Sequence, residues 1–220
     1  MPRALILAHR GDWSRGDENS LAAFAAALRR PGVDGVEFDV RAARDGTPVV
    51  IHDATLRRVR GLDRRVRELS VAELRDRGVP ALVDVLDALP EPFFLDIELK
   101  DDVAARVVPI LAAARGDPPR QAVLSSFRAD AIASLRAAAP GWPSWLIERR
   151  LDPAVVQRAI ALGCTGIAAE WPAISAAAIG FVREARLDLA TWTVKDPGTL
   201  ARVAAMGAIA ICIDPGALAD

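Results

Sequence analysis

Two histidines are the residues of this sequence best suited to proton transfer. The chain contains no others, and each one ends a short apolar run, His9 at the end of residues 6–9 and His52 at the end of residues 49–52. An imidazole titrates at about pH 6.5, so one ring can accept a proton while another donates one. A lone histidine at a strand end is more often a hydrogen-bonded structural group, but two of them near strand-end acids favour acid–base catalysis.

Acidic residues alternate with apolar ones in the segment Val36-Glu37-Phe38-Asp39-Val40. Residues two apart point to the same side of a β-strand, so Glu37 and Asp39 share one face. The two acids could lie on an exposed strand face. That alternative fits poorly with a strand of a parallel barrel, which is covered on both sides, and a buried pair of like charges needs a cation or a proton to compensate.

A second segment, residues 94–100, repeats this arrangement and places Asp96, Glu98 and Lys100 on one face. If the two segments are neighbouring strands, three carboxylates converge on an all-oxygen site. Mg²⁺ and Ca²⁺ prefer such ligands, whereas Zn²⁺ more often takes nitrogen or sulfur. The predicted metal ligands are Glu37, Asp39 and Glu98.

Positive charges accompany these acids. Arg10 follows the first histidine, and Lys100 lies beyond Glu98. A divalent cation, two imidazoles and two fixed positive charges suit phosphoryl transfer, because they can neutralise a phosphate and move protons. Lys100 could instead serve only as an ion-pair partner of Asp96 or Glu98. The spacing alone would equally serve a metal-dependent aldolase or lyase.

The elements that must position these residues alternate along the chain, short apolar runs with Ala-rich helical segments. We predict strands over residues 4–9, 35–40, 93–100, 122–127, 144–148, 166–170, 189–194 and 209–214. Helices are predicted over residues 20–30, 70–77, 83–89, 103–115, 129–139, 153–162, 175–186 and 197–206. Eight such repeats favour an α/β fold, a (β/α)8 TIM barrel, in which strand-end residues form the active site; a doubly wound open sheet is the alternative.

One segment interrupts this alternation. Residues 44–47 form a turn, and Pro48–His52 is another apolar run. So short a connection can join only antiparallel strands. We therefore predict that strand two extends into an extra β-hairpin over residues 36–52, which returns His52 to the mouth of the barrel.

The composition limits the remaining possibilities. The 220 residues suit a single domain (1–220), and a net charge of −1 gives no basic surface for nucleic acid or for stable membrane association. No apolar run approaches the roughly 20 residues of a spanning helix, and no leader is evident. Two cysteines, Cys164 and Cys212, are predicted to be packed core thiols. We expect a cytoplasmic enzyme of a small-molecule substrate; its oligomeric state stays open.

The ordered motifs resemble those of the glycerophosphodiester phosphodiesterase family along nearly the whole chain. The opening match is His9-Arg10-Gly11 followed by Glu18-Asn19-Ser20 and Ala23-Phe24. The later matches are residues 35–40, 45–53 with Thr55-Leu56, 79–82 with 85–86, 97–100, 125–127, 192–194 and 213–215. Any one of these motifs alone would be weak; their order is specific.

The resemblance implies metal-dependent hydrolysis of glycerophosphodiesters to sn-glycerol 3-phosphate and an alcohol. His9 and His52 are then similar to the family's acid–base pair, and Arg10 and Lys100 to its phosphate-binding cations. Trp192 resembles its aromatic wall beside the glycerol. The divalent cation, Mg²⁺ or Ca²⁺, is left open, as is which histidine is the acid. A related lipid phosphodiesterase resembling lysophospholipase D, or a catalytically silent binding protein on the same scaffold, are the alternatives.

The sequence departs from the family pattern at four positions, Ser20, Asp96, Lys195 and Cys212, and none removes a proposed catalytic group. Lys195 and Asp96 change the expected charge of the pocket. Of the tryptophans other than Trp192, Trp13 and Trp171 are the better candidates for the pocket because they follow predicted strands. The arginine-rich segment 57–67 is predicted to be a solvated loop that could steer anions.

Overall fold

Eight parallel strands close into a barrel in the computed structural model, which describes residues 3–218. Each strand pairs with the next, and β1 pairs with both β9 and β2, which closes the ring. The strands are β1 (Leu5–His9), β2 (Gly35–Ala42), β4 (Phe94–Leu99), β5 (Ala122–Ser126), β6 (Ser144–Glu148), β7 (Gly166–Glu170), β8 (Asp188–Val194) and β9 (Ala210–Ile213). The predicted TIM barrel is confirmed, and the closure excludes an open sheet.

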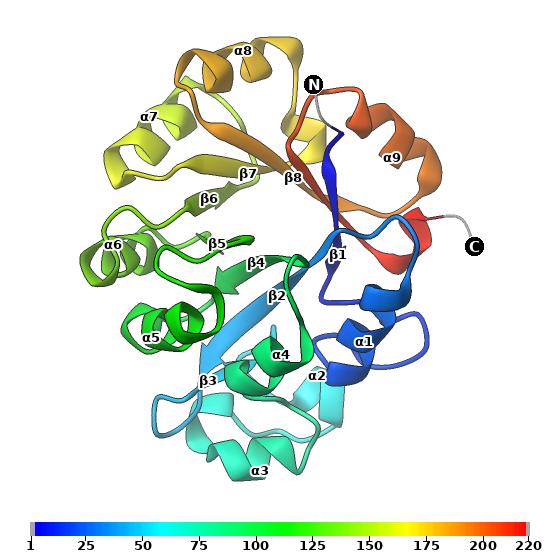
Figure 1. Cartoon of the computed structure of the whole chain (residues 1–220), viewed down its shortest axis with the longest axis vertical. Helices are drawn as coiled ribbons and strands as arrows, with labels where there is room; N and C mark the ends of the chain where they lie inside the picture. Colours follow the sequence, from blue (N-terminus) through cyan, green and yellow to red (C-terminus); the bar gives the residue numbers. More distant parts are fainter. Residues whose placement is uncertain (1–2, 219–220) are drawn as a thin grey trace.

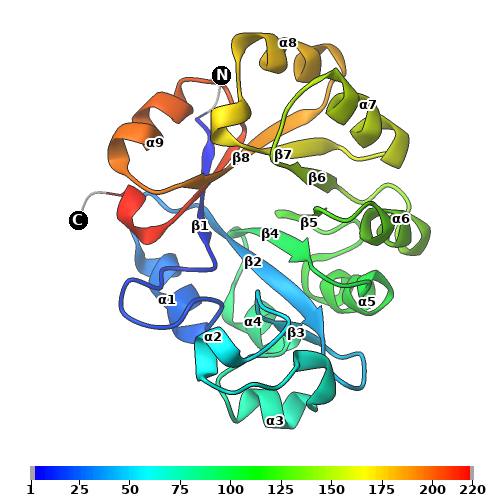
Figure 2. The ribbon, with the colours of Figure 1, turned by 180° about the vertical axis from the view of Figure 1, so that it is seen from behind.

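Helices surround this ring of strands (Figure 1, and from behind Figure 2). They are α1 (Leu21–Arg29), α3 (Val71–Arg75), α4 (Leu82–Ala88), α5 (Ala104–Arg115), α6 (Ala129–Ala138), α7 (Pro153–Leu162), α8 (Ala176–Glu184) and α9 (Pro197–Ala204). Several begin at a side-chain cap: Ser20, Asp152, Ser175 and Asp196 each accept a backbone N–H of the first turn. All eight predicted helices are present, with ends shifted by up to two residues.

The hairpin after β2 is confirmed, although its second strand is shorter than predicted. Strand β3 (Pro48–Val50) runs antiparallel to β2, with Val40 opposite Val50. Beyond β3, the backbone N–H of Ile51 still donates to the carbonyl of Asp39 at 2.9 Å, and Arg41 Nε donates to the carbonyl of His52 at 2.7 Å. This contact fixes the backbone of His52 at the mouth of the barrel, where the turn alone would leave it free.

Four short helical turns were not predicted. They are α2 (Arg57–Arg60) and the 3₁₀ turns η1 (Val66–Glu68), η2 (Trp171–Ala173) and η3 (Pro215–Ala217). The arginine-rich segment 57–67 is therefore partly folded. It is anchored by Leu56, which is fully buried and whose backbone N–H donates to Arg64.

The main core lies between the barrel and its helices, and it orients the polar side chains inside. On β2 the side chains of Val36, Phe38 and Val40 are buried, and Phe38 packs on Phe24 of α1 with ring centroids 5.6 Å apart. Burying one such side chain contributes roughly 1.5–3 kcal/mol. Because the pleat alternates, the outward packing of Phe38 directs Glu37 and Asp39 into the barrel.

Both cysteines are free and buried, as predicted. Among residues 3–218, no helix is long and apolar enough to cross a membrane.

Candidate active site

A cavity of about 250 Å³ opens at the carboxyl ends of the barrel strands, and its two halves differ in character. Titratable side chains line the half formed by β1 to β4: His9, Arg10, Glu37, His52, Asp96, Glu98 and Lys100. The half formed by β5 to β9 is mainly apolar and includes Phe127, Trp145, Ile147, Ala168, Ala190 and Trp192, with Arg149 beside them. This position is where TIM barrels carry their active sites.

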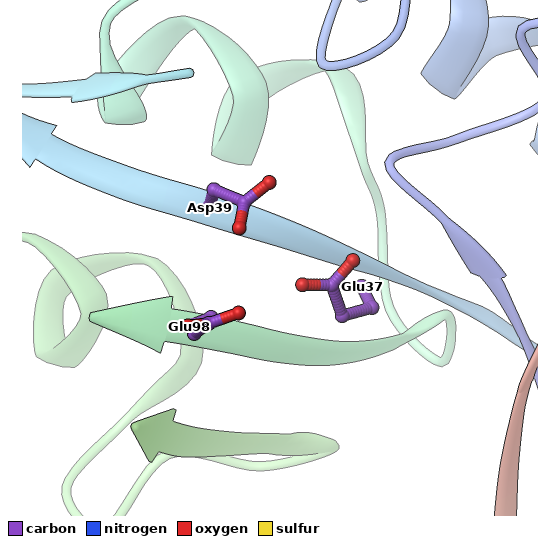
Figure 3. Close-up of side chains that lie close together, drawn as sticks. All are labelled: Glu37, Asp39 and Glu98. Carbon is purple, nitrogen blue, oxygen red and sulfur yellow. The ribbon is translucent and has the colours of Figure 1, made fainter. Parts of the chain in front are cut away.

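The three predicted metal ligands lie together. Asp39 on β2 is directly opposite Glu98 on β4 in the sheet register. Glu37 lies two residues earlier on β2, on the same face of the strand. One carboxylate oxygen of each lies within 4.8 Å of those of the other two. Figure 3 shows the carboxylates of the two strands directed toward a common space. All three are buried, with exposed fractions of 6% for Glu37, 0% for Asp39 and 7% for Glu98.

Burial and mutual repulsion set the charge of these acids. Burial, followed by the charge of Asp39, raises the pKa of Glu98 to about 7 and that of Glu37 well above its ordinary value. Burial raises the pKa of Asp96 to about 7, although Ser125 Oγ donates to it at 2.5 Å. Burial would also raise the pKa of Asp39, but the nearby cations outweigh it and hold that pKa low.

Two cations bracket Asp39. Lys100 Nζ lies 3.1 Å from Asp39 Oδ1 and 2.6 Å from Glu98 Oε1, and Arg10 Nε lies 3.1 Å from Asp39 Oδ2. Lys100 thus forms the ion pair considered as its alternative role, and it also lines the cavity, where its charge can meet an anion.

The donor set fits a hard divalent cation. It consists of carboxylate oxygens from two adjacent strands, and burial with like-charge repulsion leaves it in need of positive charge. Asp39 Oδ1 is buried and lies 3.1 Å from the Lys100 ammonium, but it accepts no well-directed hydrogen bond from the described residues. Three carboxylates share only two cations here, so the cluster can accept further positive charge. Glu37, Asp39 and Glu98 are therefore the residues that could hold Mg²⁺ or Ca²⁺.

The two histidines share one arrangement. His9 Nδ1 lies 2.7 Å from Asp214 Oδ1, and His52 Nδ1 lies 2.7 Å from Asp53 Oδ1. An ionised carboxylate can only accept, so in each ring Nδ1 carries the proton and Nε2 is left to exchange one. His9 Nε2 lies 3.9 Å from Glu37 Oε2, which places it beside the acidic cluster. Burial is the main cause that lowers the pKa of His52.

The loop after β1 holds the cluster from one side. Arg10 and Asn19 both adopt positive φ angles, 59° and 54°, which are rare for residues other than glycine. Asn19 Nδ2 donates to Asp39 Oδ2 at 2.8 Å, and the Asp39 N–H donates back to Asn19 Oδ1 at 3.3 Å. Backbone strain of this kind persists only where surrounding contacts require it, and it is common at functional sites.

An aromatic wall faces the charged half of the cavity. Trp192 packs edge-on against Phe127, with centroids 5.4 Å apart, and its Nε1 donates to the carbonyl of Ala168. The prediction for the other tryptophans was wrong. Trp145 lines the cavity, whereas Trp13 donates to the backbone carbonyl of His9 and Trp171 packs beneath the guanidinium of Arg202. A position just after a strand did not decide which indole turns inward.

Several residues at the site were not assigned a role from the sequence. Asp214 and Phe127 lie inside motifs that resemble the family, and each directly follows a strand, which is the signal that could have identified them. Asp53 follows His52 directly. Arg149 follows β6 and lines the cavity, and no ion pair with a described residue involves it. Nothing in its sequence context marked it.

The sequence profile of the glycerophosphoryl diester phosphodiesterase family matches residues 9–93 and 82–216, nearly the whole chain. The chain belongs to this family. A probable glycerophosphodiester phosphodiesterase of Mycobacterium tuberculosis is 31% identical to it in an alignment of length 202 that covers 77% of this chain and 73% of the relative. Alignments with two further curated relatives span 63% and 47% of their lengths.

Solved structures share this architecture. The glycerophosphodiester phosphodiesterase of Thermotoga maritima superimposes with a TM-score of 0.81 at 25% identity, covering 97% of this chain and 95% of that one. A phosphodiesterase of Oleispira antarctica, solved in complex with the product sn-glycerol-3-phosphate, superimposes with a TM-score of 0.86 at 23% identity, covering 96% and 93%. The second likeness concerns the fold alone.

Proposed function

We propose that this protein hydrolyses glycerophosphodiesters to sn-glycerol 3-phosphate and an alcohol with the help of a divalent cation. One observation carries the proposal: two imidazoles, each hydrogen-bonded through Nδ1 to an aspartate, face one cavity beside a cluster of three buried carboxylates, and two cations line the same cavity. Family membership supports the reaction class. The product named for the Oleispira antarctica phosphodiesterase supports the choice of product.

The charged half of the cavity would bind the phosphate. Arg10 and Lys100 would offset the negative charge that grows on the phosphoryl oxygens in the transition state. Glu37, Asp39 and Glu98 would hold Mg²⁺ or Ca²⁺, which supplies further positive charge to the phosphate. Lys100 Nζ already contacts two of these acids. A phosphate held by the cation would therefore lie close to the Lys100 ammonium.

Proton transfer would fall to His9 and His52. One imidazole would accept a proton at Nε2 from the attacking oxygen, which is either water or the neighbouring glycerol hydroxyl. The other would donate its Nε2 proton to the oxygen of the leaving alcohol as the P–O bond breaks. Asp214 and Asp53 would keep both rings in the required tautomer. Direct attack by water gives both products at once, whereas hydroxyl attack requires a second step in which water opens a cyclic phosphate.

The apolar half would receive the glycerol. Trp192 would form the wall beside it, since an indole offers a flat apolar face and its N–H is already occupied by Ala168. A related activity toward lysophospholipids, in which the same phosphodiester carries an acyl chain, is the alternative.

Release of sn-glycerol 3-phosphate from glycerophosphocholine by the purified protein tests the proposal. The metal is removed with EDTA, and Mg²⁺, Ca²⁺ and Zn²⁺ are then added back singly. We expect activity with Mg²⁺ or Ca²⁺, and ³¹P NMR should show glycerol 3-phosphate as the phosphorus-containing product. Full activity after exhaustive chelation would remove the metal from the proposal. Turnover of lysophosphatidylcholine but not of glycerophosphocholine would favour the alternative.

A further inference from the structure

Arg58, in the arginine-rich segment after the hairpin, bridges two carboxylates, Asp53 and Glu18, that lie behind residues lining the active-site cavity. Its Nε donates to Asp53 Oδ2 at 2.7 Å, and its Nη2 lies 3.2 Å from Asp53 Oδ1. The same Nη2 donates to Glu18 Oε1 at 2.5 Å. The guanidinium itself does not line the cavity, and the side chain is 50% exposed.

Each of these carboxylates contacts a group that does line the cavity. Asp53 Oδ1 accepts from His52 Nδ1 at 2.7 Å, and Glu18 Oε1 accepts from Arg10 Nη1 at 2.9 Å. A single oxygen, Glu18 Oε1, therefore serves Arg10 and Arg58 together. The chain of contacts runs from His52 through Arg58 to Arg10 and joins a proposed acid–base group to a proposed phosphate-binding cation.

This arrangement differs from an ordinary surface ion pair, which contributes little because two flexible side chains must be held in one geometry. Here the planar guanidinium makes a two-point contact with Asp53 and a third with Glu18, a fork that lysine cannot reproduce. The backbone near Arg58 is also held, since Leu56, two residues earlier, is fully buried and its N–H donates to the carbonyl of Arg64.

The charges are consistent with a permanent link. Burial would raise the pKa of Glu18 and of Asp53, but hydrogen bonding to Arg58 and the charges around them lower both. Both carboxylates thus stay ionised at neutral pH and can act only as acceptors. A carboxylate that only accepts keeps the proton of His52 on Nδ1.

We propose that Arg58 is a positioning residue that orients His52 through Asp53 and Arg10 through Glu18 as one unit. The proposal rests on the function proposed above for His52 and Arg10. Without the guanidinium, Asp53 and Glu18 lose the contact that fixes their rotamers, and the spacing between the imidazole and the phosphate-binding cation is no longer set. Supporting contacts of this kind typically contribute 10–100-fold to activity.

The test compares Arg58→Ala with Arg58→Lys and with the control Arg57→Ala. Arg57 is the neighbouring exposed arginine of the same short helix, and no ion pair with a described residue involves it. We expect Arg58→Ala to lower kcat/KM by roughly 10–100-fold and Arg57→Ala to leave it nearly unchanged. Arg58→Lys should stay close to Arg58→Ala, because it restores the charge without the fork. Full activity in Arg58→Lys would overturn the role of the fork.

Chemical rescue separates positioning from a general loss of structure. Because Arg58 is half exposed, millimolar guanidinium, far below the molar concentrations that unfold proteins, can enter the space left in Arg58→Ala. It should restore activity, whereas tetramethylammonium at the same ionic strength should not. An inactive Arg58→Ala protein that guanidinium does not rescue would count against the proposal.

A readout without substrate keeps this test distinct from that of the proposed function. In ¹⁵N-histidine NMR spectra, the protected Nδ1–H signal of His52, assigned with His52→Ala, should weaken in Arg58→Ala and return with guanidinium. The corresponding signal of His9 should not change, because its partner is Asp214. An unchanged His52 signal in Arg58→Ala would overturn the positioning role, whether or not the protein hydrolyses glycerophosphodiesters.

Discussion

His9 Nδ1 and Asp214 Oδ1 lie 2.7 Å apart although 205 positions separate them in the sequence. The contact spans the seam of the barrel, where β1 pairs with β9. His9 therefore receives its partner only when the last strand closes the ring. His52 depends on the adjacent Asp53 instead, so one histidine is oriented by the global fold and the other by a local contact.

Replacing Asp214 with Asn should lower kcat by roughly 10²–10⁴-fold, the range for general acid–base catalysis. An amide can donate to Nδ1 as well as accept from it, so His9 would no longer be held with its proton on Nδ1. Steady-state kinetics with glycerophosphocholine measures the change. Lys195→Gln is the control, since Lys195 is exposed and lies 4.0 Å from Asp214 without contacting His9; an equal loss there would point to local charge rather than to the tautomer.

Each histidine should be essential on its own, and the losses of kcat in the two single variants should not add in the double variant. We expect His9→Ala and His52→Ala each to lower kcat by roughly 10²–10⁴-fold. Because the acid and the base act in one reaction, the double variant should be only slightly worse than either single variant. Glycerol 3-phosphate release by the three variants measures this. Near-normal turnover in His9→Ala would remove its catalytic role.

The acidic cluster could be predicted because its geometry follows from the strand pleat. Glu37 and Asp39, two residues apart on one strand, had to share a face, and the apolar partner Phe38 identifies which face is inside. The register between strands was not available from the sequence. It places Asp39 opposite Glu98 and Glu37 opposite Asp96, and it explains why one cation, Lys100, reaches two acids.

Contacts between distant segments could not be predicted from local patterns. Arg58 meets Glu18 across 40 positions, and the segment that contains it looks like a solvated charge run. Its structural signal is a few apolar residues spaced among the arginines: Leu56 and Val66 are buried, and Val59 and Leu62 pack against the same cluster. The choice of Trp145 rather than Trp13 as a residue that lines the cavity likewise depends on the side of the barrel wall on which each indole packs.

The metal-free protein should lose stability as pH rises from about 4 to about 7. Burial raises the pKa of Asp96 to about 7, so between the unfolded value near 3.8 and the folded value the native state binds the extra proton, and stability falls with increasing pH. Chemical denaturation in EDTA from pH 4.5 to 7.5 measures the slope. Asp96→Asn, which alters no predicted metal ligand, should flatten it; identical slopes for both proteins would contradict the shift.

A divalent metal ion should stabilise the folded protein, because it binds the buried carboxylates and offsets the repulsion between their charges. A ligand that binds only the native state adds about 2.7 kcal/mol at a free concentration 100-fold above its Kd, and each kcal/mol raises Tm by roughly 2–4 °C in a protein of this size. Glu37→Gln should abolish the increase, because it removes a predicted ligand. The metal-free variant should nevertheless unfold at a higher temperature than the metal-free native protein, since burial and the charges of Asp39 and Glu98 oppose ionisation of Glu37.

These two opposite effects distinguish a metal site from a merely acidic pocket. Thermal denaturation is followed in EDTA and then with Mg²⁺ or Ca²⁺ for the native protein, for Glu37→Gln and for the control Glu184→Gln, an exposed acid at the end of α8. The control should respond to metal as the native protein does. If Glu37→Gln retains the full increase in Tm, the ion binds elsewhere, and the buried carboxylates must be compensated by protons and by Lys100 and Arg10 alone.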